Sequence, residues 1–225
     1  MLVAYASSVN IVLPKKATNR VDYAAEYLQK KLLQQGFAVS VTKNGKADKN
    51  SECKVYLSIS KNTASLKKEG FEITTTVKQS KKGAITNISI VGNDGTGCIY
   101  ACNELAEQIK KNGISKLPSS VKDAPEMVLR GGCIGVQKPY LLPGRMVYEY
   151  PYTPELFPWF YDKQHWIEYL DMLVENRMNS VYLWNGHPFA SLVKLPDYPY
   201  AVEVDDATFE KNKEIFAFLT KEADR

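Results

Sequence analysis

Residues 127–189 contain two short apolar runs separated by an amphipathic stretch, and this order limits the folds open to the chain. The apolar runs at 127–129 and 181–184 predict strands, the first extending over 127–134, and helical spacing predicts a helix between them. The apolar stripe of that helix consists of Trp166, Leu170, Leu173 and Val174. A strand, a helix and a second strand form the repeating unit of parallel α/β sheets. We therefore expect residues 127–225 to begin a (β/α)8 barrel, of which the chain holds the first βα units.

Polar and glycine residues follow each of these predicted strands. Arg130 and two glycines follow the first apolar run, and Asn185, Gly186 and His187 follow the second. The carboxyl ends of parallel strands carry the active-site face of an α/β barrel. The pattern therefore predicts that both ends contribute to one site.

The residues before the predicted barrel form a separate pattern. Strands are expected at 10–13, 37–41, 53–59, 70–77 and 85–91, and helices at 19–35 and 97–112. Asn19 is the expected N-cap of the first helix. Each strand has one apolar face, which predicts a mixed β-sheet with two helices on one face, an α/β (α+β) front domain over 1–113. Two prolines and three serines mark 114–126 as a linker.

Composition and charge exclude several classes of protein. No apolar run approaches the ~20 residues that span a bilayer, so we expect no membrane span. Residues 1–117 carry 18 Lys and Arg against 9 Asp and Glu, a net charge of +9, whereas 118–225 carry −5. A basic half can indicate a nucleic-acid surface. Its lysines are scattered and not interleaved with aromatic residues, which favours a solvated surface and no nucleic-acid partner.

The glycine turn at 92–97 and the four cysteines are the candidates for a cofactor or metal site. The turn lacks the Gly-x-Gly-x-x-Gly and P-loop patterns, so close packing of a strand on a helix explains its glycines better than a nucleotide does. The cysteines, with His165 and His187, do not have the spacing of a zinc site. We therefore expect no cofactor, no metal and mostly buried free thiols.

The amino terminus and the first barrel loop each leave two alternatives open. Ala4-Tyr5-Ala6 before Ser7 fits either the remnant of a secretory signal, which would make the protein periplasmic or secreted, or a chance match. The loop of roughly 27 residues after the first barrel strand is too long and too aromatic to be a simple connection. Its rings either stack on sugars or form a packed lid. His165 is expected to be structural rather than catalytic.

Residues 10–113 resemble the small α/β domain that precedes the barrel in family 20 β-N-acetylhexosaminidases and in α-glucuronidases. The similarity rests on Ile90-Val-Gly-Asn-Asp-Gly-Thr-Gly-Cys-Ile-Tyr100, which continues into Glu104-Leu-Ala-Glu-Gln-Ile109. Leu129-Arg130-Gly131 is similar to the Arg-Gly that opens the hexosaminidase barrel, where the arginine holds sugar hydroxyls. The chain departs from that family at 132–135, where Gly-Cys-Ile-Gly replaces Leu-Asp and a second arginine.

The resemblance implies the N-terminal part of a glycoside hydrolase acting on an oligo- or polysaccharide. The expected sugar-binding residues are Arg130, Trp184, Asn185 and His187. Arg130 would donate a fork of hydrogen bonds, and Trp184 would stack. The catalytic residues are unknown, because the paired acids of these families lie on later barrel strands, expected after Arg225. We therefore expect the 225 residues alone to be inactive. The alternative is a non-catalytic carbohydrate-binding or interaction module.

Overall fold

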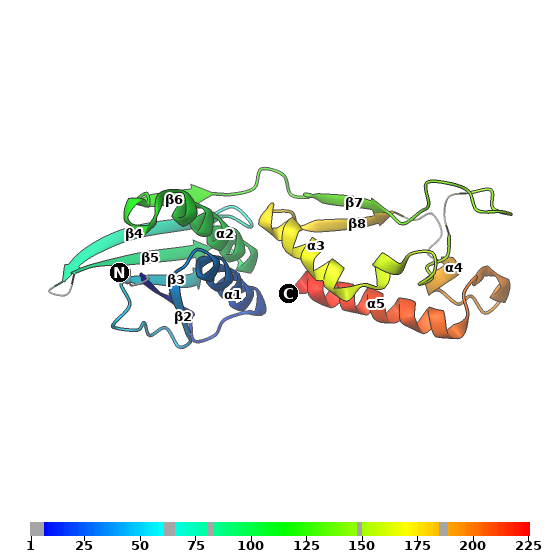
Figure 1. Cartoon of the computed structure of the whole chain (residues 1–225), viewed down its shortest axis with the longest axis horizontal. Coiled ribbons are helices and arrows are strands. Elements are labelled where there is room, and N and C mark those ends of the chain that lie inside the picture. The colour runs from blue at the N-terminus through cyan, green and yellow to red at the C-terminus, as the bar shows by residue number, and fades with distance from the viewer. Residues whose placement is uncertain (1–6, 61–65, 81–82, 148–149, 185–188) are drawn as a thin grey trace, which may run out of the picture. The chain divides into compact units, whose positions relative to one another are not determined.

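The computed structural model divides the chain into two compact units (Figure 1). The front unit comprises Met1–Val128 and the second unit Leu129–Arg225. The residues that the structure describes are 7–60, 66–80, 83–147, 150–184 and 189–225. The Ala4-Tyr5-Ala6 motif therefore lies outside the described residues. Among these residues, no helix has both the length and the apolar composition needed to cross a membrane.

The front unit is built on one mixed sheet, as the sequence predicted, but the sheet has six strands where five were expected. In spatial order its strands are β2 (Ala38–Thr42), β1 (Ser8–Val12), β3 (Cys53–Ile59), β5 (Gly83–Gly92), β4 (Phe71–Ser80) and β6 (Ser120–Asp123). The first four run parallel to one another, whereas β4 is antiparallel to both of its neighbours. The long β4–β5 pairing joins the parallel part of the sheet to its antiparallel edge.

Two helices cover one face of this sheet, α1 (Asn19–Gln34) and α2 (Gly95–Asn112) (Figure 1). Their inward stripes and the sheet residues beneath them are fully buried, which makes this the core of the front unit. The N-cap of α1 is Thr18 and not the expected Asn19. Thr18 has an extended backbone and its Oγ1 accepts a hydrogen bond from the Val21 backbone N–H, which is the geometry of an N-cap.

The expected linker at 114–126 contains regular structure. A short 3₁₀ helix, η1 (Ile114–Lys116), leads into β6, which pairs with β4 through Ile73 opposite Val121. The Thr75 backbone N–H also donates to the Ser119 carbonyl. Strand β6 is mostly exposed and has no clear apolar alternation, because the free edge of β4 supplies its hydrogen bonds. Composition alone therefore did not predict it.

The glycine turn at 92–97 packs β5 and α2 closely, in agreement with the interpretation made from sequence. Asp94 is the N-cap of α2, and its Oδ1 accepts from the Gly97 N–H at 2.8 Å. Its Oδ2 accepts from the Glu69 N–H at 3.0 Å, which ties the start of α2 to the segment before β4. A Cβ on Gly97 would lie 2.3 Å from the Gly70 carbonyl oxygen. The close approach of two backbone segments thus requires glycine here.

All four cysteines are free thiols, and three of them are buried. Burial raises the pKa of Cys53 to about 12 and that of Cys98 to about 11, and it raises the pKa of Cys102 well above its ordinary value. Cys133, in the second unit, is exposed. The expectation of mostly buried thiols is confirmed. No group of three or more His, Cys, Asp and Glu suited to a metal ion occurs among the described residues.

The second unit contains a two-stranded parallel sheet of β7 (Gly131–Gly135) and β8 (Ser180–Trp184). Helix α3 (Lys163–Glu175) connects the strands, so the predicted strand–helix–strand order is confirmed. The Asp162 carboxylate caps α3 as expected, accepting from the Gln164 and His165 N–H groups. The remaining elements are η2 (Pro158–Tyr161), α4 (Phe189–Leu192), η3 (Pro199–Ala201) and α5 (Asp206–Asp224).

The close packing at Gly97 leads to a prediction with an unusual sign. Replacing an unconstrained helical glycine with alanine stabilises a protein, because alanine has less backbone freedom to lose. We expect Gly97→Ala to destabilise this chain instead, by about 1–3 kcal/mol, because the added methyl group meets the Gly70 carbonyl. Urea unfolding followed by circular dichroism measures the change. The control is Glu107→Ala at an exposed position of α2, and equal unfolding midpoints for the two variants would contradict the packing argument.

Candidate functional site

Strand β7 begins later than the sequence predicted, and this changes which end of the strand the candidate residue Arg130 occupies. The expected strand began at Met127, but Met127, Val128 and Leu129 are 68%, 80% and 75% exposed and precede the strand. The strand consists of Gly131–Gly135, where the sequence predicted the polar end. Glycine weakens most strands, so Gly131 and Gly132 are predicted from sequence to end the strand, whereas in the structure they begin it.

Contacts on both sides of β7 explain why its strand residues include glycines. A Cβ on Gly131 would lie 2.0 Å from the Ser180 carbonyl oxygen of β8. A Cβ on Gly132 would lie 2.6 Å from the Tyr169 hydroxyl of α3. Small residues therefore let β8 and α3 approach the backbone of β7 closely. Such an approach is a recognised reason for glycine inside a strand.

Arg130 lies at the amino end of β7, so the prediction that it follows a strand was wrong. Its Nε donates to the Arg177 carbonyl at 2.8 Å, and its backbone N–H donates to Asn179 Oδ1 at 3.0 Å. The Arg130 carbonyl accepts from the Asn179 and Ser180 N–H groups. These contacts join the end of the α3–β8 connection to the start of β7. They give Arg130 a structural role at this end of the sheet.

Trp184 lies at the opposite end of the sheet from Arg130. The register places Gly131 opposite Ser180 and Gly135 opposite Trp184. At ~3.3 Å per residue, four residues along a strand separate the two ends by roughly 13 Å. The structure therefore does not bring Arg130 and Trp184 into one site. Trp184 is at the carboxyl end of β8 as predicted and is half exposed, whereas Asn185 and His187 lie outside the described residues.

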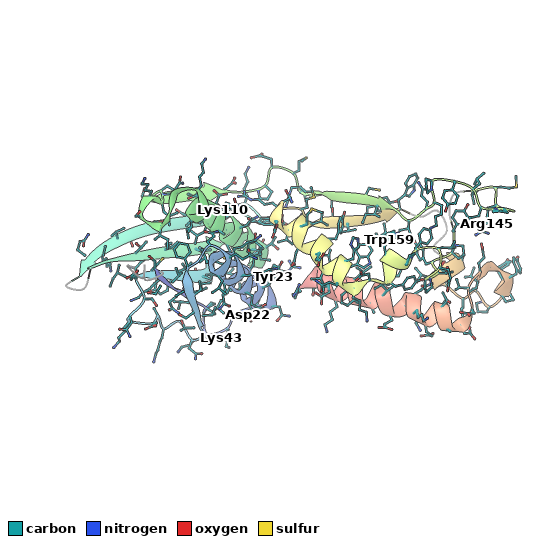
Figure 2. All side chains as sticks on the ribbon, in the orientation of Figure 1. Asp22, Tyr23, Lys43, Lys110, Arg145 and Trp159 are labelled. Atoms are coloured by element: carbon teal, nitrogen blue, oxygen red, sulfur yellow. The ribbon has the colours of Figure 1, made fainter. Side chains whose placement is uncertain are left out.

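The aromatic loop between β7 and α3 forms the core of the second unit. Its buried members pack with residues of α3 and α5 in one cluster, defined by Val136, Tyr150, Tyr152, Phe157, Phe160, Trp166 and Ile215. The Tyr152 and Phe160 rings stack with centroids 5.0 Å apart, and the Phe160 and Trp166 rings meet edge to face at 5.9 Å. Figure 2 labels Trp159, whose partly buried ring packs against this cluster. These rings are therefore packed in the core and do not form an open stacking surface; a lid over the barrel bottom or the domain interface stays a prediction.

A buried asparagine fixes this loop to α5. Asn212 Nδ2 donates to the Tyr152 and Ser191 carbonyls at 3.0 and 3.1 Å, and its Oδ1 accepts from the Tyr161 hydroxyl at 2.5 Å. Burial raises the pKa of Tyr161, and the nearby Glu155 and Tyr152 raise it further. The phenol therefore stays protonated and keeps donating to Asn212 at ordinary pH. The asparagine joins three separate segments at one point.

An ion pair joins the loops that follow the two strands. Arg145, in the loop after β7, pairs through Nη2 with Glu203 Oε2 at 2.8 Å, and its guanidinium lies over the Tyr150 ring at 5.3 Å. Figure 2 shows Arg145 on the loop beyond the carboxyl end of β7. Glu203 belongs to the segment between β8 and α5. The loops at the carboxyl ends of β7 and β8 are thus linked by charge.

Because most described aromatic rings of the loop are buried, the rings that could contact a ligand are the exposed ones. Among the described residues, the aromatic side chains counted as exposed all lie in the second unit: Tyr140, Tyr182, Trp184, Tyr198 and Tyr200. The sequence analysis missed Tyr198 and Tyr200. The signal available was the segment Leu195-Pro-Asp-Tyr-Pro-Tyr200, where two tyrosines alternate with prolines and an aspartate. Exposed aromatic surface of this kind is a common mark of a binding surface.

The Asn212 contacts predict a large effect from a small substitution. Asn212→Ala removes two donors and one acceptor and leaves the buried carbonyls without these partners, so we expect a loss of about 1–3 kcal/mol in the free energy of unfolding. Tryptophan fluorescence during urea unfolding reports this loss, because Trp166 belongs to the same core. Lys211→Ala, at an exposed position of the same helix, is the control and should change stability by less than about 0.5 kcal/mol. Equal losses would show that Asn212 does not hold the loop.

Comparisons with known proteins bear on what such a site does. No family model matches the chain, and no curated protein matches it. Among solved structures, a GH138 enzyme targeting pectin rhamnogalacturonan II is 49% identical, with a TM-score of 0.79. A chitobiase (GH20) from Flavobacterium johnsoniae has a TM-score of 0.53 at 15% identity, a likeness of fold alone. Each comparison covers 96% of this chain and 30% of the solved chain. The chain is thus similar, over nearly all its length, to the N-terminal part of glycoside hydrolases.

Proposed function

We propose that this chain is the N-terminal part of a glycoside hydrolase that acts on a pectic polysaccharide. The observation that carries the proposal is the 49% identity, over 96% of the chain, to a GH138 enzyme targeting pectin rhamnogalacturonan II. Because the chain spans 30% of that enzyme, the activity belongs to a longer protein. The resemblance to family 20 hexosaminidases is one of fold alone, since the GH20 chitobiase is 15% identical to this chain.

In this proposal the second unit is the start of a (β/α)8 barrel. The parallel β7–α3–β8 unit and the following α5 have the order of two successive βα units. Hydrolysis of a glycosidic bond needs two carboxylates, or one acid with a substrate acetamido group. We place these acids on later strands, as expected from the sequence. The contribution of this chain is then sugar binding at the carboxyl ends of β7 and β8.

The site we propose includes Trp184, Asn185 and His187 and leaves out Arg130. Trp184 offers a half-exposed indole at the carboxyl end of β8, with an N–H donor at its edge. Asn185 and His187 follow it directly in sequence and would donate to sugar hydroxyls. The place of Arg130 at the other end of the strands and its hydrogen bond to the Arg177 carbonyl argue against a sugar-binding role for it.

The rival function, a non-catalytic carbohydrate-binding module, relied on the aromatic loop as a stacking surface. Most rings of that loop are buried against α3 and α5, including Tyr152, Phe157 and Phe160. A buried ring has no free face for a sugar. The aromatic residues of the loop therefore support a packed core and not a carbohydrate-binding module.

A pair of substitutions at the two ends of the sheet tests the site. In the full-length protein, Trp184→Ala should weaken binding of a rhamnogalacturonan II oligosaccharide by up to about tenfold, the loss expected when one stacked ring is removed. Arg130→Ala should leave this affinity unchanged and lower the free energy of unfolding by about 1 kcal/mol, because it loses a partly buried hydrogen bond. Isothermal titration calorimetry and urea unfolding separate the two effects. A loss of affinity in Arg130→Ala alone would contradict this assignment.

We also expect the isolated 225-residue chain to hydrolyse no glycoside. A barrel closes with eight strands, whereas the second sheet has two strands among the described residues. Unpaired strand edges favour association or aggregation, so the purified chain should oligomerise through its second unit. The assay is a panel of aryl glycosides that includes N-acetylhexosaminides and glucuronides. Turnover that follows the chain through gel filtration and disappears in Trp184→Ala would contradict the expectation.

A further inference from the structure

Two exposed tyrosines between β8 and α5 form a pair of rings on the surface of the second unit. Tyr198 is 54% exposed and Tyr200 is 77% exposed. Their ring centroids lie 6.0 Å apart and the ring planes meet at 86°, an edge-to-face arrangement. The core described above uses neither ring. Two exposed rings in contact offer apolar faces and phenol hydroxyls to a ligand.

The backbone holds this pair in place. Tyr198 lies between Pro196 and Pro199, and η3 begins at Pro199. The Tyr198 N–H donates to the Leu195 carbonyl at 3.0 Å, and the Ala201 N–H donates to the Tyr198 carbonyl at the same distance. A proline fixes φ and lowers the freedom of the chain. The rings therefore stand on a hydrogen-bonded turn, which lowers the entropy lost when a ligand binds.

The turn is also anchored to the rest of the unit. Directly after η3, the Glu203 N–H donates to the Ala190 carbonyl at 2.9 Å, and the Glu203 carboxylate pairs with Arg145 of the loop after β7. Both anchors belong to segments that follow the carboxyl ends of β7 and β8. The tyrosine pair is thus part of the same loop layer as the proposed site at Trp184, but 14 residues further along the chain from it.

We propose that Tyr198 and Tyr200 bind a sugar ring of the polysaccharide at a position separate from Trp184. This inference rests on the proposed function. The face of an aromatic ring is electron-rich and attracts the partly positive C–H groups of a pyranose, while the phenol hydroxyl hydrogen-bonds sugar hydroxyls. Two rings match one or two sugar residues in size.

The size of the patch argues against a protein partner. A stable protein interface buries about 800 Å² on each side, far more than two tyrosine rings offer. The flanking exposed residues include Lys194, Asp197 and Glu203, so the surroundings are polar. Lys194 is itself paired with Asp206 at 2.7 Å. A hydrated polymer that offers both C–H faces and hydroxyls fits this surface better.

The test compares a long and a short ligand in the full-length protein. The variants are the double substitutions Tyr198→Ala with Tyr200→Ala, and Tyr198→Phe with Tyr200→Phe. We expect the alanine pair to bind polymeric rhamnogalacturonan II about tenfold more weakly by affinity electrophoresis, the scale of one lost stacking contact. The phenylalanine pair keeps the rings and should retain most of the affinity. A disaccharide from the same polymer should bind all variants equally, because it occupies the Trp184 site alone.

Controls keep a failure of this inference distinct from a failure of the proposed function. Leu33→Ala removes an exposed apolar side chain of α1 in the front unit and should not alter affinity. Unchanged polymer binding by the alanine pair, with normal binding by the wild-type protein, overturns the second sugar position. Equal weakening of disaccharide binding also overturns it, because the rings would then belong to the first site. Absence of polymer and disaccharide binding by the wild-type protein overturns the proposed function itself.

Discussion

The second unit depends on the parallel pairing of β7 with β8. This pairing needs a backbone without a side chain at Gly131, since a methyl group there would collide with the Ser180 carbonyl of β8. Once the strands are paired, α3 must cross over them, and the loop after β7 is held against α3 and α5. The carboxyl ends of both strands then carry the loops that hold the exposed aromatic residues. The close approach at Gly131 thus helps to determine where the candidate site lies.

The aromatic composition of the loop after β7 suggested sugar binding, but most of its described rings stabilise the second unit by packing in its core. Its buried rings are packed with Trp166 and Ile215, and burial of a large side chain contributes about 1.5–3 kcal/mol. One polar residue, Asn212, satisfies the carbonyls and the phenol that the packing leaves inside. A satisfied polar group in an apolar core specifies one arrangement of the segments around it. The buried rings of the loop therefore stabilise the second unit. The candidate binding surface consists of the rings that remain exposed.

The sequence predicted the elements of the front unit more completely than those of the second unit. In the front unit, the apolar periodicity of the strands and helices is regular, and the predicted order of five strands and two helices was correct. The departures were local, at the Thr18 cap and at β6, where hydrogen bonds and not side-chain pattern decide the structure. In the second unit the start of β7 was misplaced, because an apolar run at 127–129 gave a stronger strand signal than the glycines that follow it.

The sequence by itself determined the fold class, the parallel order of strand, helix and strand, and the position of Trp184 at a strand end, because periodicity and local capping are properties of neighbouring residues. Only the tertiary structure decided that Arg130 and Trp184 lie at opposite ends of the sheet, since the register comes from pairing between segments about 50 residues apart. Tertiary packing also decided which aromatic rings are buried and which are exposed. Tyrosine and tryptophan occur in both groups, so residue type alone does not separate them, whereas the contacts with α3 and α5 do.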